Sequence, residues 1–462
     1  MSATKAAQDR LVVVSNRVAL PRGGAPGGLA SALHAALQDR GGLWFGWSGK
    51  LAAETAAEVH HLQQGNVEYA TVDLSHEDHR TYYTGFANGA LWPILHYRPD
   101  VVEYQRSHLA GYMQVNEKFA ERLRELVHPT DTLWIHDYHL IPLASILRRM
   151  GLKNRMGFFL HTPLPAAGLL IALPNHRELL ETLASYDLIG VHTSRDLRAL
   201  EDYFLHEAGA TMRLGGRLRM PNGRLFRAGA FPISIDTGDV EETAKKAISK
   251  PEIAQLRDSL DQQALIIGVD RMDYSKGLPQ RFRAYARLLE RDPELHRRVT
   301  FLQIAPPSRG AVKEYRQIRR ELERTAGHIN GQYAAPHWVP IRYISKSFPP
   351  DVIMGYYRSA RVGLVTPLRD GMNLVAKEYV ASQDPADPGV LVLSRFAGAA
   401  HELREALLVN PADTEEVAEA LQQALRMSRR ERRKRWAAMM DVLREHDITR
   451  WRKEFLKTLR EK

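Results

Sequence analysis

Short apolar runs recur along the chain, and each is followed by a loop marked by glycine, proline or polar residues and then by a helical pattern. The runs span residues 11–14, 133–135, 156–160 and 188–191, and later 264–269, 299–304, 362–365 and 390–393. A continuous apolar run followed by an amphipathic helix is typical of a strand buried in a parallel sheet. The pattern therefore predicts an α/β fold built from repeated strand–helix units.

This rhythm breaks near residues 231–236, between the two sets of runs. At 462 residues the chain exceeds one ordinary core, so we predict two doubly wound, Rossmann-like domains, at residues 1–235 and 236–462. Open parallel sheets bind ligands beyond the carboxyl ends of their strands, so a site is expected in the cleft between two facing domains. The pattern leaves open whether a helix at about 450–459 returns to the first domain.

Composition narrows the class of protein. The chain has no cysteine, no apolar run near the ~20 residues that span a bilayer, and an N-terminal segment without the features of a secretory signal. We therefore expect a soluble, cytoplasmic protein that does not bind membranes.

The net charge of +10 suits anionic partners in general. The densest basic run, at 429–435, contains a glutamate and lacks interleaved aromatic residues, so we interpret it as a solvated helix face and predict no nucleic-acid binding. An RNA-binding patch is the alternative. Small anions are the more promising ligands.

The first loop with candidate chemistry follows the run at 11–14. It contains Arg17, Arg22 and four glycines, and a helix is expected to begin near Gly28. Glycine turns allow a backbone to approach phosphate, and a helix N-terminus favours anions. The spacing matches no established phosphate-binding motif, so an ordinary mobile loop is an equal alternative.

The second loop follows the run at 264–269 and carries Arg271 and Lys276. Two cations five residues apart on one strand-to-helix loop can converge on a diphosphate. Asp270 and Asp273 lie close by in the sequence, so the alternative is a surface cluster of ion pairs that contributes little.

The third loop follows the run at 362–365 and carries Asp370, with Glu378 inside the next predicted helix. A carboxylate one to two turns into such a helix can accept both hydroxyls of a ribose, while the helix N-terminus faces phosphate. Asp370 could instead be only a helix cap.

Two further predicted strands end in histidine, in the segments WIHDYHL and FFLHTPLP. The spacing of His136, Asp137 and His139 matches no metal-binding signature, so we predict no metal. His161 suits a hydrogen-bond donor to substrate, and a core histidine bonded to backbone is the alternative.

Seven sequence blocks occur together in a defined order: SNR at 15–17, GLWFGWSG at 42–49, LWP with HYR at 91–98, WIHDYHL at 134–140, DYSKGLP at 273–279, IAPPSRG at 304–310 and PLRDGMNLVAKEYVASQ at 367–383. Together they resemble the trehalose-6-phosphate synthases, which are retaining glycosyltransferases of GT-B architecture with two facing Rossmann-like domains. The resemblance covers most of the chain. It implies an enzyme of trehalose biosynthesis and stress response that transfers glucose from UDP-glucose to glucose 6-phosphate.

The resemblance also implies an acceptor site on the N-terminal side. Arg17 and Arg309 would hold the phosphate of glucose 6-phosphate, because a guanidinium can bind phosphate through two parallel hydrogen bonds. Tyr83, Trp92 and Asp137 would surround the sugar.

For the donor, the resemblance implies that Gly27 and Gly28 let the backbone approach, that Arg271 and Lys276 neutralise the diphosphate, and that His161 and Asp370 contact the transferred glucose. The remaining implied donor residues are Phe348, near the base, and Leu374, Val375, Ala376, Lys377 and Glu378, which bind the nucleoside with Glu378 on the ribose. Arg271, Lys276 and a helix N-terminus would stabilise the leaving phosphate, His161 and Asp370 would be the other catalytic residues, and the reaction would need no cofactor or metal.

The chain departs from the family in one block, which reads His161–Thr162–Pro163–Leu164–Pro165 where the family usually has HIPFP. Trp92 and Thr162 would lie where the resemblance places selection of the acceptor anomer.

Other acceptors therefore stay open, such as glycerol 3-phosphate or a cyclitol in a pseudo-glycosyltransferase. A catalytically silent sugar-phosphate sensor is the non-enzyme alternative. The nucleotide base is not fixed, and a homo-oligomer such as a tetramer is implied only by the resemblance.

Overall fold

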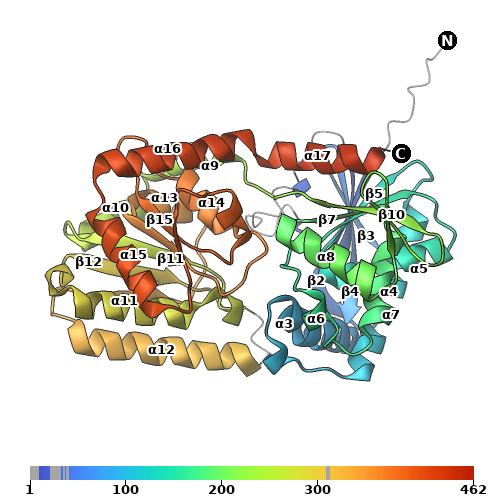
Figure 1. The fold of residues 1–462 in the computed structure, drawn as a ribbon, viewed down its shortest axis with the longest axis horizontal. Helices are drawn as coiled ribbons and strands as arrows, with labels where there is room; N and C mark the ends of the chain where they lie inside the picture. The colour runs from blue at the N-terminus through green and yellow to red at the C-terminus, as the bar shows by residue number, and fades with distance from the viewer. Residues whose placement is uncertain (1–9, 21–32, 35–36, 38–40, 309–312, 462) are drawn as a thin grey trace, which may run out of the picture. The chain divides into compact units, whose positions relative to one another are not determined.

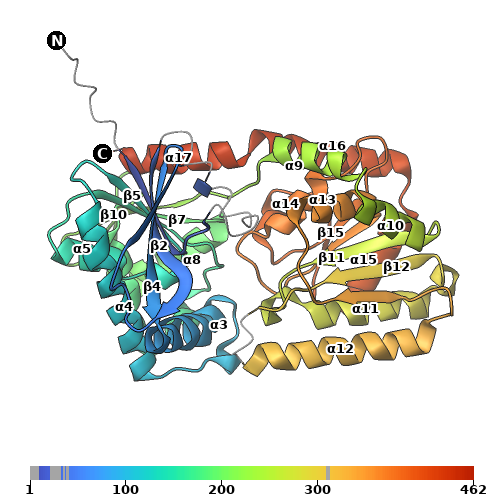
Figure 2. The ribbon, with the colours of Figure 1, turned by 180° about the vertical axis from the view of Figure 1, so that it is seen from behind.

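The computed structural model describes residues 10–20, 33–34, 37, 41–308 and 313–461. The chain divides into two compact units. Unit 1 comprises Met1–Pro232 together with Trp451–Lys462, and unit 2 comprises Ile233–Arg450. Each unit is built around its own sheet (Figures 1 and 2). In the described part of the chain, no helix is long and apolar enough to cross a membrane.

Unit 1 contains a ten-stranded sheet in the order β3-β4-β2-β1-β5-β6-β7-β10-β9-β8. The strands from β4 to β10 pair in parallel, whereas β3 at one edge and β9 and β8 at the other pair antiparallel. Their bounds are β1 (Leu11–Arg17), β2 (Gly42–Ala52), β3 (His60–Gln64), β4 (Val67–Ser75), β5 (Thr132–His136), β6 (Arg155–Phe159), β7 (Leu188–Val191), β8 (Thr211–Arg213), β9 (Arg217–Arg219) and β10 (Leu225–Ala230). The parallel strands β1, β5 and β6 therefore end at the same edge of the sheet.

Helices cover this sheet. The α-helices are α2 (His76–Asp78), α3 (Trp92–Leu95), α4 (Arg106–Leu126), α5 (Leu143–Arg149), α6 (Ala167–Leu170), α7 (His176–Leu180), α8 (Ser194–His206) and α17 (Ile448–Arg460). The other helices are the π-helix η1 (His79–Leu91) and the 3-10 helices η2 (Pro99–Val101), η3 (Tyr138–Leu140) and η4 (Glu181–Ser185).

Helix α17, drawn in red in Figure 1, packs on the sheet of unit 1 although it is distant from it in sequence. Its residues Trp451, Phe455 and Leu459 are buried. Gly157 and Gly190 make room for them, because a Cβ at either position would lie within 2.9 Å of the Phe455 ring. The two glycines thus allow an aromatic ring to lie directly on the backbone of β6 and β7.

Unit 2 contains a six-stranded sheet in which every neighbouring pair is parallel, in the order β13-β12-β11-β14-β15-β16. This order is 3-2-1-4-5-6 when the strands are counted along the chain, which is the Rossmann order. The strands are β11 (Ala264–Val269), β12 (Val299–Ile304), β13 (Ile341–Ile344), β14 (Val362–Val365), β15 (Val390–Ser394) and β16 (Leu407–Val409).

Figures 1 and 2 show α11 and α12 on one face of this sheet and α9, α13 and α14 on the other. The helices are α9 (Thr237–Ala247), α10 (Pro251–Leu260), α11 (Leu278–Arg291), α12 (Lys313–Tyr333), α13 (Pro350–Ser359), α14 (Leu374–Ala381), α15 (Thr414–Arg426) and α16 (Arg429–Glu445), with 3-10 helices η5 (Tyr274–Lys276), η6 (Pro293–Leu295) and η7 (Gly398–His401). The topological switch lies between β11 and β14, and the loops after these strands are where such a sheet binds ligands.

The predicted fold class, an α/β protein with two parallel-sheet, Rossmann-like domains, is confirmed. All eight apolar runs coincide with strands that pair in parallel in the two sheets. The domain boundaries at 1–235 and 236–462 stay a prediction. The two compact units of the structure divide after residue 232, and residues 451–462 belong to unit 1.

Candidate active site

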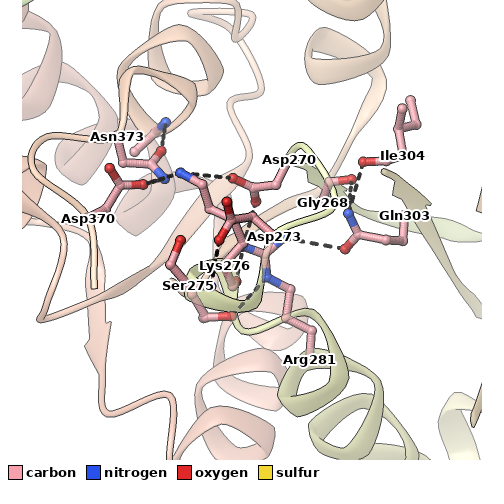
Figure 3. Close-up of polar contacts among 12 residues, drawn as sticks. Gly268, Asp270, Asp273, Ser275, Lys276, Arg281, Gln303, Ile304, Asp370 and Asn373 are labelled. Carbon is pink, nitrogen blue, oxygen red and sulfur yellow. Dashed lines mark hydrogen bonds and ion pairs between the residues drawn. The ribbon is translucent and has the colours of Figure 1, made fainter. Parts of the chain in front are cut away.

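The loops after β11 and β14 meet in unit 2 and bring Lys276 and Asp370 together (Figure 3). Nζ of Lys276 lies 2.5 Å from Oδ2 of Asp370 and 3.9 Å from Oδ1 of Asp270. The Leu368 N–H donates to the Ser275 carbonyl at 2.7 Å and ties the two loops to each other. One cation and two carboxylates thus share a small volume at the carboxyl end of the sheet.

The local sequence fixes the turn that carries Lys276. A carboxylate oxygen of Asp273 accepts a hydrogen bond from the Ser275 N–H at 2.9 Å and holds the short helix η5. Gly277 then has a φ of +66°, and a Cβ there would lie 2.4 Å from the Thr366 carbonyl oxygen. Glycine is required by both the left-handed φ and the close approach of the β14 loop.

Behind this cluster lies Arg281 of α11, whose side chain is fully buried. It donates to Asp270 Oδ2 at 2.6 Å, to Thr366 Oγ1 at 2.9 Å and to Gln303 Oε1 at 3.3 Å. The guanidinium therefore links the carboxyl ends of β11, β12 and β14 (Figure 3). Arg281 lies in no loop singled out from the sequence, although an arginine on the apolar face of a predicted helix is a signal of a buried, paired cation.

Lys276 remains charged in this setting. Burial disfavours its charged form, but Asp370 and Asp270 outweigh burial and raise the pKa of Lys276 above its ordinary value. Arg271, which is exposed, acts against them through its own charge. Arg271 therefore lies within electrostatic reach of Lys276, and two cations are available to a diphosphate.

The buried positions of Asp270 and Asp273 show that the alternative of a surface ion-pair cluster is wrong. Asp270 pairs with Arg281 in the interior, and Asp273 shapes the turn. These carboxylates build the loop that presents Lys276.

The β14 loop leads into α14, whose first turn is shaped by Asn373. This residue has a φ of +76°, accepts the Ala376 N–H at 3.1 Å and donates to Asp370 Oδ2 at 3.0 Å. The alternative in which Asp370 is only a cap is wrong, because the cap is Asn373. The N–H groups of Leu374 and Val375 lie in the first turn, where the helix dipole favours an anion.

Two neighbouring side chains of α14 have opposite environments. Lys377 is fully buried and donates to Glu402 Oε2 and to the Ile233 carbonyl, each at 2.8 Å. Its side chain therefore makes structural contacts inside unit 2. Glu378 is partly buried, and burial raises its pKa to about 7. Its carboxyl forms no hydrogen bond or ion pair with any residue that the structure describes. Both of its oxygens can therefore accept ligand hydroxyls.

Phe348 precedes α13. Its ring meets Tyr356 edge-on at 5.5 Å, and Lys346 Nζ lies 5.2 Å from the ring centre. Within the described residues no hydrogen bond, ion pair or ring contact joins Phe348 to Lys276.

In unit 1, Arg17 at the end of β1 lies beside Trp47. Its Cζ atom is 6.0 Å from the Trp47 ring centre, and a Cβ at Gly49 would lie 2.8 Å from Nε of Arg17. The glycine thus leaves room for the guanidinium. Tyr83 lies 5.7 Å from the same tryptophan ring, so Trp47 connects two predicted acceptor residues. Trp47 lies in one of the seven blocks, GLWFGWSG at 42–49, but is not among the predicted site residues.

Tyr83 and Trp92 belong to one aromatic wall. The Tyr83 ring stacks on His139 at 5.8 Å and 11°. Tyr138 lies 4.0 Å from His139 and 5.6 Å from Trp92. Rings of this kind form the apolar lining of small-molecule sites.

Asp137 follows β5 with a φ of 76° and a ψ of 165°, a backbone conformation that is nearly confined to glycine. Its Oδ1 accepts the His161 N–H at 3.2 Å, and its own N–H donates to the Phe159 carbonyl at 2.8 Å. These contacts hold the strained residue and connect the ends of β5 and β6. Strain of about 1–3 kcal/mol at one residue is typical of functional sites.

His161 follows β6, and its Nε2 lies 3.0 Å from Nδ1 of the fully buried His136. The ring partner of His161 is thus a side chain, and the alternative of a histidine bonded to backbone is wrong. Burial lowers the pKa of His136 to about 3, and burial together with His136 and His192 lowers the pKa of His161. Both imidazoles are therefore neutral at physiological pH.

Thr162, the residue that departs from the family block, is buried. Its Oγ1 has no hydrogen-bond partner among the described residues. The loop that contains it is anchored by Asp196, whose Oδ1 accepts the Leu164 N–H at 3.0 Å.

Four residues singled out from the sequence, Arg22, Gly27, Gly28 and Arg309, lie outside the described residues. Among the residues that are described, no group of three or more His, Asp or Glu side chains could hold a metal ion.

Comparisons with known proteins agree with this arrangement. The sequence profile of glycosyltransferase family 20 matches residues 12–461. A trehalose-6-phosphate synthase of Sinorhizobium fredii is 52% identical over 456 residues, which cover 98% of each chain.

Two solved structures are also similar. An α,α-trehalose-phosphate synthase (UDP-forming) from Burkholderia xenovorans, in complex with glucose-6-phosphate, is 48% identical with a TM-score of 0.94 over 98% of this chain and 100% of that one. A structure from E. coli bound with UDP-2-fluoro glucose is 46% identical with a TM-score of 0.93 over 98% of this chain and 99% of that one. The chain is therefore an enzyme that belongs to glycosyltransferase family 20.

Proposed function

We propose that this enzyme transfers a glucosyl group from UDP-glucose to glucose 6-phosphate, with retention at the anomeric carbon, and releases trehalose 6-phosphate and UDP. The observation that carries the proposal is the cluster of Lys276, Asp370 and the α14 N-terminus at the switch point of unit 2. The glucose-6-phosphate complex of one relative and the UDP-2-fluoro glucose complex of another support the choice of substrates.

The donor binds at unit 2 in this proposal. Lys276 and Arg271 neutralise the diphosphate, and the first turn of α14 adds N–H groups and a positive dipole. Because the carboxylates keep Lys276 protonated, its charge is present when negative charge grows on the leaving UDP. Glu378 accepts the ribose hydroxyls, Phe348 lies near the base, and the glycines at 27 and 28 let the backbone approach.

The acceptor binds at unit 1. Arg17 and Arg309 hold the phosphate, and Tyr83 and Trp92 pack against the sugar. Asp137 accepts a sugar hydroxyl, a role that its strained backbone supports. Trp92 and Thr162 select the acceptor anomer.

In the reaction, the bond between the anomeric carbon and the UDP oxygen breaks while the acceptor hydroxyl attacks from the same face. The leaving phosphate oxygen takes the proton of that hydroxyl, which balances the charge without a protein nucleophile. His161 and Asp370 contact the glucose as positive charge develops on its ring. The protein supplies position and electrostatic stabilisation, and we propose that no cofactor or metal takes part.

The cytoplasmic location, the role in stress response and the homo-oligomer stay predictions. Acceptor-binding and donor-binding domains at 1–235 and 236–462 are likewise part of the proposal.

The test is release of UDP from UDP-glucose with and without glucose 6-phosphate, followed by mass analysis of the sugar product. We expect release that depends on glucose 6-phosphate and a phosphorylated dihexose. Release with glycerol 3-phosphate but not glucose 6-phosphate would contradict the acceptor, and release from GDP- or ADP-glucose alone would contradict the donor. Binding of glucose 6-phosphate without turnover on any nucleotide sugar would favour a sensor.

A further inference from the structure

His136 contacts a proposed substrate-binding residue but touches no substrate in the proposed mechanism. It ends β5, is fully buried, and its Nδ1 lies 3.0 Å from Nε2 of His161. The other ring nitrogen, Nε2, is buried and has no hydrogen-bond partner among the residues that the structure describes. The Trp134 ring lies 4.6 Å away. Among the described residues, His161 is therefore the hydrogen-bond partner of the His136 ring.

The hydrogen bond between two neutral imidazoles has one donor and one acceptor. If Nδ1 of His136 carries the proton, its buried Nε2 keeps only a lone pair, and His161 Nε2 accepts. If His161 Nε2 carries the proton, His136 must bury an N–H group without a partner. Buried N–H groups without partners are rarer than buried acceptors without partners, so the first arrangement is favoured.

In the first arrangement His161 carries its proton on Nδ1. The ring is only partly buried, and Nδ1 forms no hydrogen bond with the described residues, so this nitrogen is the one that can meet a ligand. An Nδ1–H group donates to a sugar hydroxyl, whereas a bare Nδ1 could only accept.

We propose that His136 is a positioning residue that donates its Nδ1–H to His161 and thereby fixes His161 as a neutral Nδ1–H donor toward the transferred sugar. The sugar contact rests on the proposed function, whereas the tautomer does not. The other titratable groups that face His161 are His192, whose ring lies 5.4 Å away, and Asp137, which accepts its backbone N–H. Neither replaces the bond from His136.

The direct test is ¹⁵N NMR of histidine-labelled full-length protein without substrate, because the two tautomers and the imidazolium give distinct ¹⁵N–¹H correlation patterns. Signals of His161 and His136 are assigned by single substitution. We expect His161 to be protonated on Nδ1 alone at pH 7.5. A proton on Nε2 of His161, or an imidazolium, would overturn the proposal whether or not the enzyme makes trehalose 6-phosphate.

Three variants test the consequence for catalysis. His136→Phe removes the donor and also the unpartnered nitrogen, so we expect the fold to persist while kcat falls about 10- to 100-fold, the range seen for partners that orient metal-ligating histidines. His136→Asn places an N–H close to the former Nδ1 and should restore kcat to within about threefold of wild type. His176→Phe is the matched control, because it removes the hydrogen bond between His176 Nδ1 and the Tyr203 hydroxyl elsewhere in unit 1.

The outcomes are distinct. Positioning is supported if kcat falls in His136→Phe, is restored in His136→Asn and is normal in His176→Phe. The KM for glucose 6-phosphate should be unchanged in all three variants. Equal losses in the Phe and Asn variants would show a purely structural role. If His136→Phe misfolds, His136→Asn and the NMR pattern of the wild-type protein still decide the question.

Discussion

Removal of the Lys276 cation is the most informative perturbation of the donor site. In Lys276→Ala, Asp370 and Asp270 would lose the positive charge that lies 2.5 and 3.9 Å from their oxygens. They would then repel an incoming diphosphate. Two unit charges 3.9 Å apart, the longer of these separations, interact by about 4 kcal/mol at an effective dielectric constant of 20. Since loss of one preorganised group at a developing charge typically costs about 2.7–4 kcal/mol, we expect kcat/KM to fall by about 100-fold or more.

The assay is coupled detection of UDP at saturating glucose 6-phosphate, with calorimetric titration of UDP as a second measurement. Lys250→Ala is the matched control, because it breaks an exposed ion pair with Asp351 on the surface of unit 2 and should stay within about twofold of wild type. A second substitution, Asp370→Asn, placed in Lys276→Ala should recover part of the UDP affinity by removing one repelling charge. Near-normal kcat/KM in Lys276→Ala would refute the donor-site assignment.

Three further predictions follow from other contacts. Arg281→Met leaves the carboxylate of Asp270 buried without its partner, so the free energy of unfolding in urea should fall by about 3–5 kcal/mol; a loss below about 1 kcal/mol would show that Arg281 does not hold the loops. Glu378 has a pKa raised by burial to about 7, so its carboxylate form increases as pH rises from 6 to 8, and UDP affinity should rise with it in the wild type relative to Glu378→Gln; parallel pH profiles would contradict a ribose contact. Asp137→Asn should chiefly raise the KM for glucose 6-phosphate, and an effect on the KM for UDP-glucose alone would contradict its placement.

The buried strands could be predicted from sequence because a parallel strand covered on both faces is a continuous apolar run. Strand β2 (Gly42–Ala52) was missed, since its second half is only partly buried and lacks such a run. The π-helix η1 (His79–Leu91) also has no signal of this kind, because its hydrogen bonds depart from the usual helical period. A strand that is buried over only part of its length and a helix with irregular geometry are thus fixed by tertiary packing.

In the candidate site, the strand-to-loop transitions predicted where Lys276, Asp370 and His161 would lie. Sequence alone could not pair them, because the contact of Lys276 with Asp370 joins loops 94 residues apart. The buried partners Arg281 and His136 escaped prediction for a related reason. Arg281 pairs with Asp270 and His136 pairs with His161, and those contacts form only in the folded chain.

The basic run at 429–435 shows the limit of charge patterns. Most of its side chains are solvated as expected, but Arg432 is buried and pairs with Asp387 at 2.7 Å. An arginine inside a basic run can therefore be buried when it forms an ion pair with an acidic residue.

The packing of α17 on unit 1 has a consequence for the order of folding during synthesis. Unit 2 is continuous in sequence, so it can fold as soon as it has emerged from the ribosome. Unit 1 begins earlier, yet Phe455 and Leu459 must still arrive to cover Gly157 and Gly190. Each of these side chains contributes about 1.5–3 kcal/mol by burial. The first-made half of the protein is therefore the last to complete its core, because the surface of β6 and β7 that α17 covers stays uncovered while the second half is being translated.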